Sequence, residues 1–285
     1  MRVGTKKQGY TIVEVMIFLA ISGFMFIIAA GFVSGKQAKS EFRQGMNDIN
    51  SQIQQTIEDV SNGFYPSNGD FGCEAVGPGT PSFPASVANE TGTNKGCTFI
   101  GKVVQFGVDS PTSPKYNIYS VIGRQFQADS ESYLPPTNFV EAKPVAMTGA
   151  SGSKDLTQTS TLKWGLEVDE MYNHTRATPI GAVGFFSGFA STTNTNLDSG
   201  AAAVTAIPIP NSQLGQGTTD IDGQITSLSD GTAVIDTDPE ITICFKGASN
   251  QYGRLTIGTS DNVKGQKLAT HIQISTGTPS TGCSA

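Results

Sequence analysis

The sequence contains few of the residues and motifs from which enzymes build their sites. It has two histidines, His174 and His271, which stand far apart in the chain. It has no H-E-x-x-H zinc motif, no G-x-S-x-G nucleophile motif and no G-x-x-x-x-G-K-[ST] phosphate loop. Each of these motifs sets a reactive group or a phosphate-binding backbone at a fixed spacing. We therefore expect neither catalysis nor a cofactor.

From Gly9 to Val33 the sequence also lacks proline and, apart from Glu14, any charged residue. The stretch reads GYTIVEVMIFLAISGFMFIIAAGFV. As an α-helix, residues 10–33 span roughly 36 Å at about 1.5 Å per residue, enough to cross a bilayer core of about 30 Å. The residues before Gly9 include three basic side chains and no acid, which keeps them in the cytoplasm and directs the rest of the chain outward.

The residues around Gly9 resemble a known processing signal. Lys6 and Lys7, then Gly9, then the segment YTIVE at residues 10–14 and a hydrophobic helix resemble the class III signal of type IV pilin-like proteins. In that family a membrane-embedded prepilin peptidase cuts after the glycine, methylates the new amino terminus and leaves a glutamate five residues into the mature chain. The resemblance implies cleavage between Gly9 and Tyr10, N-methylation of Tyr10, and Glu14 as that glutamate.

Glu14 needs a partner, because a carboxylate inside a spanning helix costs about 2.5–3.5 kcal/mol on insertion scales. One interpretation is local: Thr11 and Glu14 fit the S/T-x-x-E capping box, and an acid in the first turn complements the helix dipole. The other is intermolecular: cleavage gives Tyr10 a free, mostly cationic α-amine, which meets Glu14 of a neighbouring subunit in a filament. The two roles are compatible, and we expect the intermolecular one to matter for function.

Two other interpretations of the same stretch compete with this signal. A secretory signal peptide would be cut at a small-residue site such as residues 29–31, but the apolar run exceeds the usual h-region of about 7–15 residues and begins with a glutamate. A plain signal anchor explains the length of the run and not the placement of Gly9 and Glu14. The pilin-type signal accounts for all three features.

The sequence has little positive charge to offer a nucleic acid. Only 15% of its residues are charged, and its net charge is −6. Loss of the leader removes Arg2, Lys6 and Lys7 and no acid, which takes the net charge to −9. This balance argues against general binding to nucleic acid or anionic lipid, although a local basic patch would still allow it.

The four cysteines lack the spacing of a metal site. There is no C-x-x-C pair and no histidine beside a cysteine, which argues against zinc. The helix delivers Cys73, Cys97, Cys244 and Cys283 outside the cytoplasm, where disulfides persist. Of the three possible connectivities, sequence proximity favours Cys73 with Cys97 and Cys244 with Cys283. The second pair resembles the carboxy-terminal disulfide loop of many pilins.

The helix is expected to continue beyond the membrane. After Lys36 the chain is polar, but apolar residues recur at steps of three or four and form one stripe on a helix that ends near Gly63. Gly63 suits a left-handed C-cap, and Pro66 prevents resumption. We expect the stripe to pack on the chain's own globular domain, not on a coiled-coil partner. It consists of Phe42, Met46, Ile49, Ile53, Ile57 and Val60.

Beyond residue 63, short runs of β-forming residues alternate with turn clusters. Leu162, Trp164 and Leu166 alternate with polar residues and predict a buried strand. Loops are expected at residues 148–160, 191–200 and 211–231. Residues 241–257 resemble the hairpin near the end of minor pseudopilins of the GspH and FimT type. The predicted strands are residues 98–107, 116–124, 139–147, 161–168, 181–189, 202–207, 232–235, 240–245, 254–259 and 271–275.

The expected fold class is α+β, with a long N-terminal helix and a β-rich C-terminal domain that carries two disulfides. We place the leader peptide at residues 1–9 and the transmembrane and filament-core helix at residues 10–35. The amphipathic continuation of that helix, packed on the domain, follows at residues 36–62. Residues 63–285 form the extracytoplasmic β-rich domain.

The resemblance implies a structural subunit, and the length of the chain favours a minor pilin or pseudopilin. Its partners would be prepilin peptidase, an inner-membrane assembly platform and other pilin-like subunits. It would span the cytoplasmic membrane once, with its N-terminus in the cytoplasm, before it enters a surface pilus or a pseudopilus for DNA uptake or secretion. Two alternatives are a tip module that binds DNA or a surface, and a membrane-anchored domain that never polymerises.

Amino-terminal sequencing of the mature protein distinguishes the interpretations of the signal. We expect N-methylated Tyr10 as the first residue, because cleavage follows Gly9. A first residue near Gly31 would indicate a secretory signal peptide, and an intact Met1 would indicate a plain signal anchor. Either result would contradict the pilin-type signal.

Overall fold

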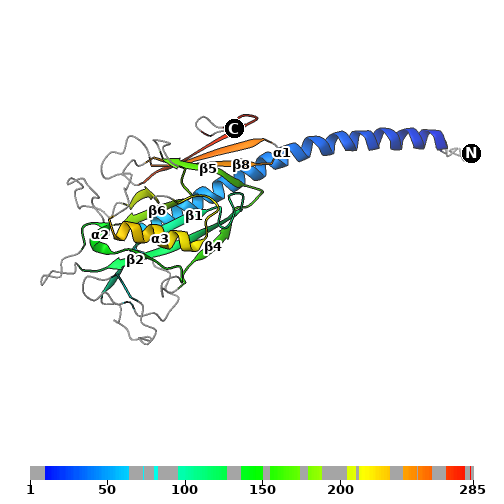
Figure 1. The fold of residues 1–285 in the computed structure, drawn as a ribbon. Helices are drawn as coiled ribbons and strands as arrows, with labels where there is room; N and C mark the ends of the chain where they lie inside the picture. Colours follow the sequence, from blue (N-terminus) through cyan, green and yellow to red (C-terminus); the bar gives the residue numbers. More distant parts are fainter. Residues whose placement is uncertain are drawn as a thin grey trace, which may run out of the picture. The chain divides into compact units, whose positions relative to one another are not determined.

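The structure is a computed structural model (Figure 1). It describes residues 10–63, 73, 80–82, 96–126, 136–149, 155–173, 179–187, 204–209, 212–231, 240–248, 250–258, 268–279 and 283. The chain divides into two compact units, Met1–Glu41 and Phe42–Ala285. An N-terminal apolar helix followed by a β-rich domain confirms the predicted α+β class.

Helix α1 (Ile12–Ser61) begins in the first unit and ends in the second. Beyond its last turn, the Asn62 N–H donates to the Glu58 carbonyl oxygen at 2.9 Å, and the Gly63 N–H donates to that of Val60 at 3.1 Å. Gly63 has a φ of 64°, the left-handed conformation that glycine adopts most easily. The helix therefore ends in a glycine cap.

The first sheet is antiparallel and lies entirely in the second unit. Its strands follow the order β3-β2-β1-β6-β7, and β4 also pairs with β2. The longest pair, β1 with β2, contains a register shift between Phe99 and Gly101. The strands are β1 (Cys97–Phe106), β2 (Lys115–Arg124), β3 (Val145–Ala146), β4 (Gln158–Thr161), β6 (Ala182–Ser187) and β7 (Val204–Pro208).

The second sheet has four antiparallel strands in the order β10-β9-β8-β5. Strands β8 and β9 form an antiparallel hairpin. The strands are β5 (Glu167–Asn173), β8 (Ile241–Gly247), β9 (Gln251–Ile257) and β10 (Thr270–Thr276).

The main core of the second unit forms around the last turns of α1. All six residues of the apolar stripe are at most 3% exposed, and they join one cluster with residues of both sheets. Figure 1 shows this part of α1 between the sheets. The approach is close: a side chain at Gly247 would meet the Phe42 ring, and a Cβ at Gly253 would lie 2.6 Å from the Met46 sulfur.

A second core covers the opposite face of the first sheet. Here the helices α2 (Phe139–Ala142) and α3 (Thr218–Ser229) pack on the sheet, and the rings of Phe139 and Phe186 meet edge to face at 4.8 Å. A polar network is buried beside it. The Tyr119 hydroxyl donates to Gln105 Oε1 at 2.7 Å and accepts from Asn117 Nδ2 at 2.8 Å. Burial raises the pKa of Tyr119 to about 12, so the phenol stays protonated.

Three sequence-based predictions in this region are wrong. The segment 139–147 begins with helix α2, because the Asn138 side chain accepts the Glu141 N–H at 2.9 Å and caps it. The segment 161–168 is interrupted by a turn at which Trp164 is 45% exposed, and a strand resumes only at Glu167. Much of the predicted loop 211–231 is helix α3. The predicted strand 232–235 and loop 191–200 lie outside the described residues.

Truncation at the centre of the stripe tests this core. Ile53 is 1% exposed, so we expect Ile53→Ala to lower the free energy of unfolding by about 2–5 kcal/mol through lost burial and a residual cavity. Gln55→Ala, at an exposed position of the same helix, is the control and should change stability by no more than about 0.5 kcal/mol. Denaturant unfolding of the full chain in detergent measures both. Equal effects would contradict the burial of this face.

Candidate functional site on helix α1

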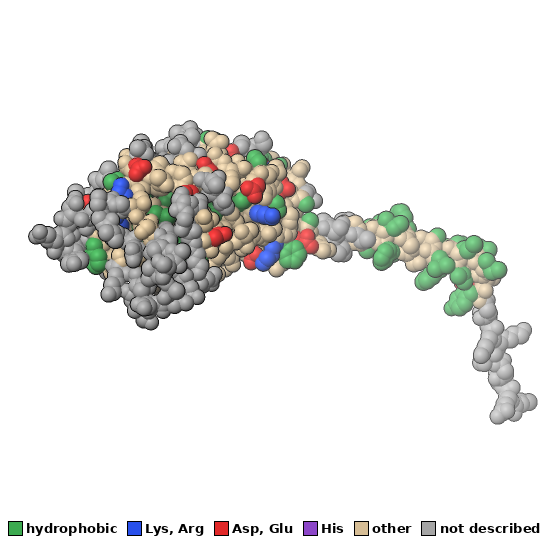
Figure 2. Space-filling view, turned by 60° about the horizontal axis from the view of Figure 1, so that its bottom comes forward, with side chains coloured by type: hydrophobic (Ala, Val, Ile, Leu, Met, Phe, Trp, Pro, Cys, Tyr) green, Lys and Arg blue, Asp and Glu red, His purple; other side chains and the backbone are tan. Residues whose placement is uncertain are grey.

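The first unit contains one strongly apolar segment, Ile12–Ala29. Within the described residues it belongs to the one helix that is long and apolar enough to cross a membrane. Its large side chains are exposed; Phe18 is 71% and Phe26 is 75% accessible. Figure 2 shows hydrophobic side chains along this helix. The segment is consistent with a single-pass membrane anchor, because exposed apolar surface of this extent is unfavourable in water.

Glu14 lies in the first turn of α1, where the local partner predicted for it is present. The Glu14 N–H donates to Thr11 Oγ1 at 3.3 Å, which is one half of a capping box. This bond uses the backbone of Glu14 and leaves its exposed carboxylate for another group. Among the described residues, no basic side chain forms an ion pair with that carboxylate.

The processing signal itself falls mostly outside the described residues. This holds for the leader charges Lys6 and Lys7 and for Gly9. Tyr10 is the first described residue and is 82% exposed. The proposed cleavage and methylation at Tyr10 are therefore tested by amino-terminal sequencing of the mature protein.

The last turns of α1 carry polar contacts to both sheets in addition to the apolar stripe. Lys102 of β1 is only 3% exposed, and its Nζ lies 2.7 Å from Asp59 Oδ2. On the other sheet, Gln54 Nε2 donates to Thr270 Oγ1 of β10 at 2.9 Å. Sequence reasoning missed the ion pair. The available signal was a lysine in the otherwise apolar centre of a strand.

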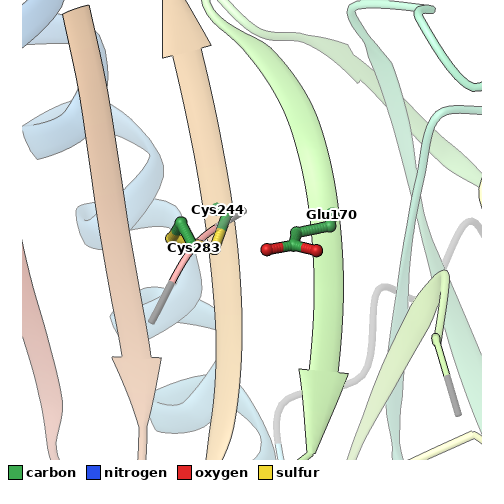
Figure 3. A group of neighbouring side chains, drawn as sticks. All are labelled: Glu170, Cys244 and Cys283. Atoms are coloured by element: carbon green, nitrogen blue, oxygen red, sulfur yellow. A yellow bond between two sulfur atoms is a disulfide. The ribbon is translucent and has the colours of Figure 1, made fainter. Parts of the chain in front are cut away.

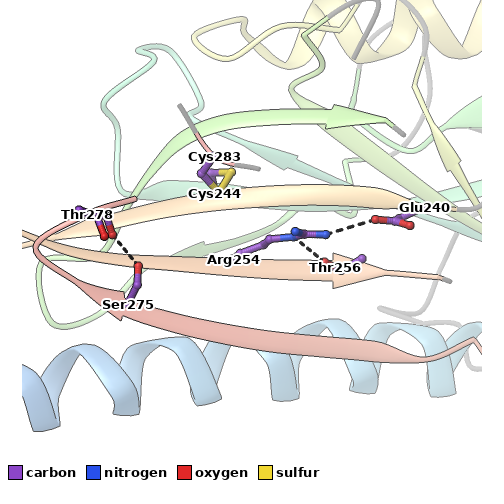
Figure 4. The surroundings of a disulfide bond; sticks show 7 residues. All are labelled: Glu240, Cys244, Arg254, Thr256, Ser275, Thr278 and Cys283. Atoms are coloured by element: carbon purple, nitrogen blue, oxygen red, sulfur yellow. Dashed lines mark hydrogen bonds and ion pairs between the residues drawn. A yellow bond between two sulfur atoms is a disulfide. The ribbon is translucent and has the colours of Figure 1, made fainter. Parts of the chain in front are cut away.

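The four cysteines form two disulfides in the second unit. Cys73 bonds to Cys97 and Cys244 bonds to Cys283, with Cα–Cα distances of 6.0 and 5.8 Å. This is the connectivity that sequence proximity favours. The second disulfide ties Cys283 to the central strand β8, as Figure 4 shows.

Glu170 lies beside the second disulfide and completes a group of three possible metal ligands (Figure 3). One oxygen of Glu170 and the sulfurs of Cys244 and Cys283 lie within 4.8 Å of one another. Both sulfurs are used in the disulfide, however, and metal binding requires thiolates. On the next strand, Arg254 opposes Cys244, and its guanidinium forms an ion pair with Glu240 at 3.3 Å (Figure 4). We assign no metal to this group.

The structure describes one of the two histidines, and it places that residue away from Glu14 in sequence and in the other unit. His174 lies outside the described residues, and His271 is an exposed residue of β10 whose Nδ1 lies 3.1 Å from the Ile272 carbonyl oxygen. Helix α1, with its exposed apolar segment and Glu14, is therefore the candidate functional site. Comparisons with protein-family models, curated proteins and solved structures find no match for this chain.

The buried ion pair can be tested by removing one partner. Asp59→Asn leaves the Lys102 ammonium buried without its carboxylate, and we expect the free energy of unfolding to fall by about 2–3 kcal/mol. This is below the about 3–5 kcal/mol of a fully buried pair, because Asp59 is 24% exposed. Lys102→Met in the same chain should restore most of the loss.

Asp48→Asn is the matched control for this test. It breaks the exposed pair with Lys163, whose side chain is 63% accessible, and should cost no more than about 1 kcal/mol. Denaturant unfolding compares the three variants. A loss for Asp59→Asn no larger than that of the control would contradict a stabilising role for the buried pair.

Proposed function

We propose that this chain is a structural subunit of a type IV filament system, a minor pilin or pseudopilin that works by assembly. In this proposal prepilin peptidase removes residues 1–9 and methylates Tyr10. The first part of α1 then holds the chain in the cytoplasmic membrane, with the β-domain outside. An assembly platform extracts the subunit and adds it to a filament whose core consists of these helices.

The observation that carries the proposal is the division of α1 into two kinds of surface. Its first part exposes large apolar side chains around one carboxylate, and its last part buries an apolar stripe in the β-domain. Exposed apolar surface favours association at roughly 25 cal/mol per Å². Lipid covers these apolar side chains before assembly, and the helices of other subunits cover them afterwards. A permanent anchor would need only the first of these environments and would have no use for Glu14.

Glu14 supplies the register of assembly in this proposal. Thr11 already caps its backbone N–H, and the carboxylate is exposed. Cleavage creates a cationic amine on Tyr10, and a charge in an apolar core is strongly destabilising unless it is paired. Because each helix core has one such carboxylate, neighbouring helices associate best at the offset that pairs it with an amine. Single polar groups fix register in coiled coils by the same physics.

The amphipathic part of α1 links the β-domain to the register that Glu14 sets. We propose that residues 36–62 stay docked on the domain throughout assembly. The buried stripe and the Lys102–Asp59 pair favour this, because separating them would expose six apolar side chains and a lysine that is 3% accessible. The domain then faces outward, and its two disulfides suit an extracytoplasmic site.

Replacement of Glu14 tests the proposal in cells that carry the assembly machinery. We expect Glu14→Ala to remain in the membrane fraction and to lose about tenfold or more of its incorporation into sheared filaments, since loss of one pairing of about 1.4 kcal/mol already corresponds to tenfold. Glu41→Ala removes a carboxylate of the same helix outside the apolar segment and should assemble normally.

Three results would contradict the proposal. The first is equal incorporation of Glu14→Ala and the wild-type chain. The second is a wild-type chain that is never found in filaments, which would favour the membrane-anchored domain. The third is loss of Glu14→Ala from the membrane, which would assign Glu14 to insertion instead of assembly.

A further inference from the structure

The turn between β4 and β5 has an unusual backbone. The Leu166 N–H donates to the Lys163 carbonyl oxygen at 3.2 Å and closes the turn. Its two central residues both have positive φ, 62° at Trp164 and 65° at Gly165. Positive φ at both positions is the pattern of a type I′ turn, which favours asparagine, aspartate or glycine. A tryptophan at the first central position is therefore strained.

The strain at Trp164 is not explained by burial of its side chain. Trp164 is the one tryptophan of the chain and is 45% exposed. In the described part of Phe42–Ala285, the only other large hydrophobic side chain with comparable exposure is Val140, at 44%. Leu162 and Leu166 on either side are buried, at 6% and 0%. The two leucines are therefore enclosed in the core, whereas the indole ring stays partly accessible.

The turn lies against α1. Gly45 provides the space: a Cβ there would lie 3.3 Å from the Lys163 carbonyl oxygen and 3.6 Å from the indole Cδ1. Lys163 Nζ lies 3.0 Å from Asp48 Oδ2, one turn further along the helix. These contacts place the turn on α1, and its closing hydrogen bond and two positive φ angles define the backbone that presents the indole ring at the surface. Such preorganisation lowers the entropy lost when a side chain binds a partner.

We propose that Trp164 anchors a contact between subunits, and that its ring packs on the apolar segment Ile12–Ala29 of a second copy of this chain. This rests on the proposed function and adds the surface by which the domain of one subunit contacts the helix of another. Tryptophan is enriched among the residues that dominate protein interfaces. The strain is offset when the ring leaves water against a partner.

The occupant follows from what the chain exposes. An indole ring needs apolar surface to pack against. Apart from Val140 and Trp164, every exposed large hydrophobic side chain among the described residues lies between Tyr10 and Ile28. Under the proposed function that segment leaves lipid on assembly and needs new apolar cover. A lipid surface adapts to any tryptophan rotamer, so a ring held in one orientation binds lipid little better than a mobile one. A helix has a fixed shape, so a ring already held in the matching orientation binds it more tightly.

Trp164→Asn separates assembly from folding. Asparagine tolerates positive φ, so the melting temperature of the variant should be unchanged or higher. Incorporation into filaments should fall by about tenfold or more, the loss expected for an interface anchor. Val140→Asn is the matched control, because it makes the other exposed apolar residue polar, and its incorporation should equal that of the wild-type chain.

The single tryptophan also reports directly on its surroundings. In assembled filaments its fluorescence should shift to shorter wavelength and lose accessibility to iodide, whereas in the membrane-held subunit iodide should quench it. Quenching by brominated lipid before assembly, with no change on assembly, would assign Trp164 to the membrane surface and overturn the proposal. p-Benzoylphenylalanine at position 164 should crosslink to residues 10–29 of another copy.

The outcomes distinguish this contact from the filament proposal. If the wild-type chain assembles and Trp164→Asn assembles equally well, the contact is wrong and the filament subunit stands. If position 164 crosslinks only to other parts of the second copy, or only to lipid, the segment Ile12–Ala29 is not what Trp164 contacts, and the filament subunit again stands. If the wild-type chain never enters filaments, both proposals are wrong.

Discussion

Burial of one face of α1 is the constraint on which the rest of the second unit depends. The stripe from Phe42 to Val60 joins a single core with β1 and β6 of one sheet and β8 and β9 of the other. Each sheet has an inner face that would be exposed without the helix. Each sheet also makes a polar contact with α1, through Lys102 of β1 and Thr270 of β10. The two glycines at residues 247 and 253 belong to the same constraint, since they let β8 and β9 approach the Phe42 and Met46 side chains.

The same helix carries two kinds of surface. Up to Ala29 its large side chains are apolar and exposed, which is consistent with a membrane anchor. From Phe42 one of its faces is buried in the core of the β-domain. In the first part Glu14 is the one charged residue, and in the second part Asp59 pairs with Lys102, which is only 3% exposed. Both place a charge where unpaired charge is unfavourable, which is why they are informative about partners.

Features that depend on local pattern could be predicted from the sequence, and features that depend on distant contacts could not. The apolar segment, the Thr11 bond to the Glu14 backbone and the general α+β class follow from periodicity and short motifs. Helix α3 was missed because its Gly, Thr and Asp content indicated a loop, although Ile221, Ile225 and Leu228 lie at helical spacing and are buried. The Lys102–Asp59 pair joins residues far apart in sequence. Trp164 was predicted as core because alternation does not reveal that a turn interrupts it.

The long separation between the stripe and its partners has a consequence for biosynthesis. The ribosome completes Met46 about two hundred residues before Gly253, so the helix waits for its core until nearly the whole chain has been made. During that interval the apolar stripe remains exposed, so it is available to chaperones and prone to misassociation. Helix α1 is therefore synthesised early, but its apolar stripe is among the last parts of the chain to be buried.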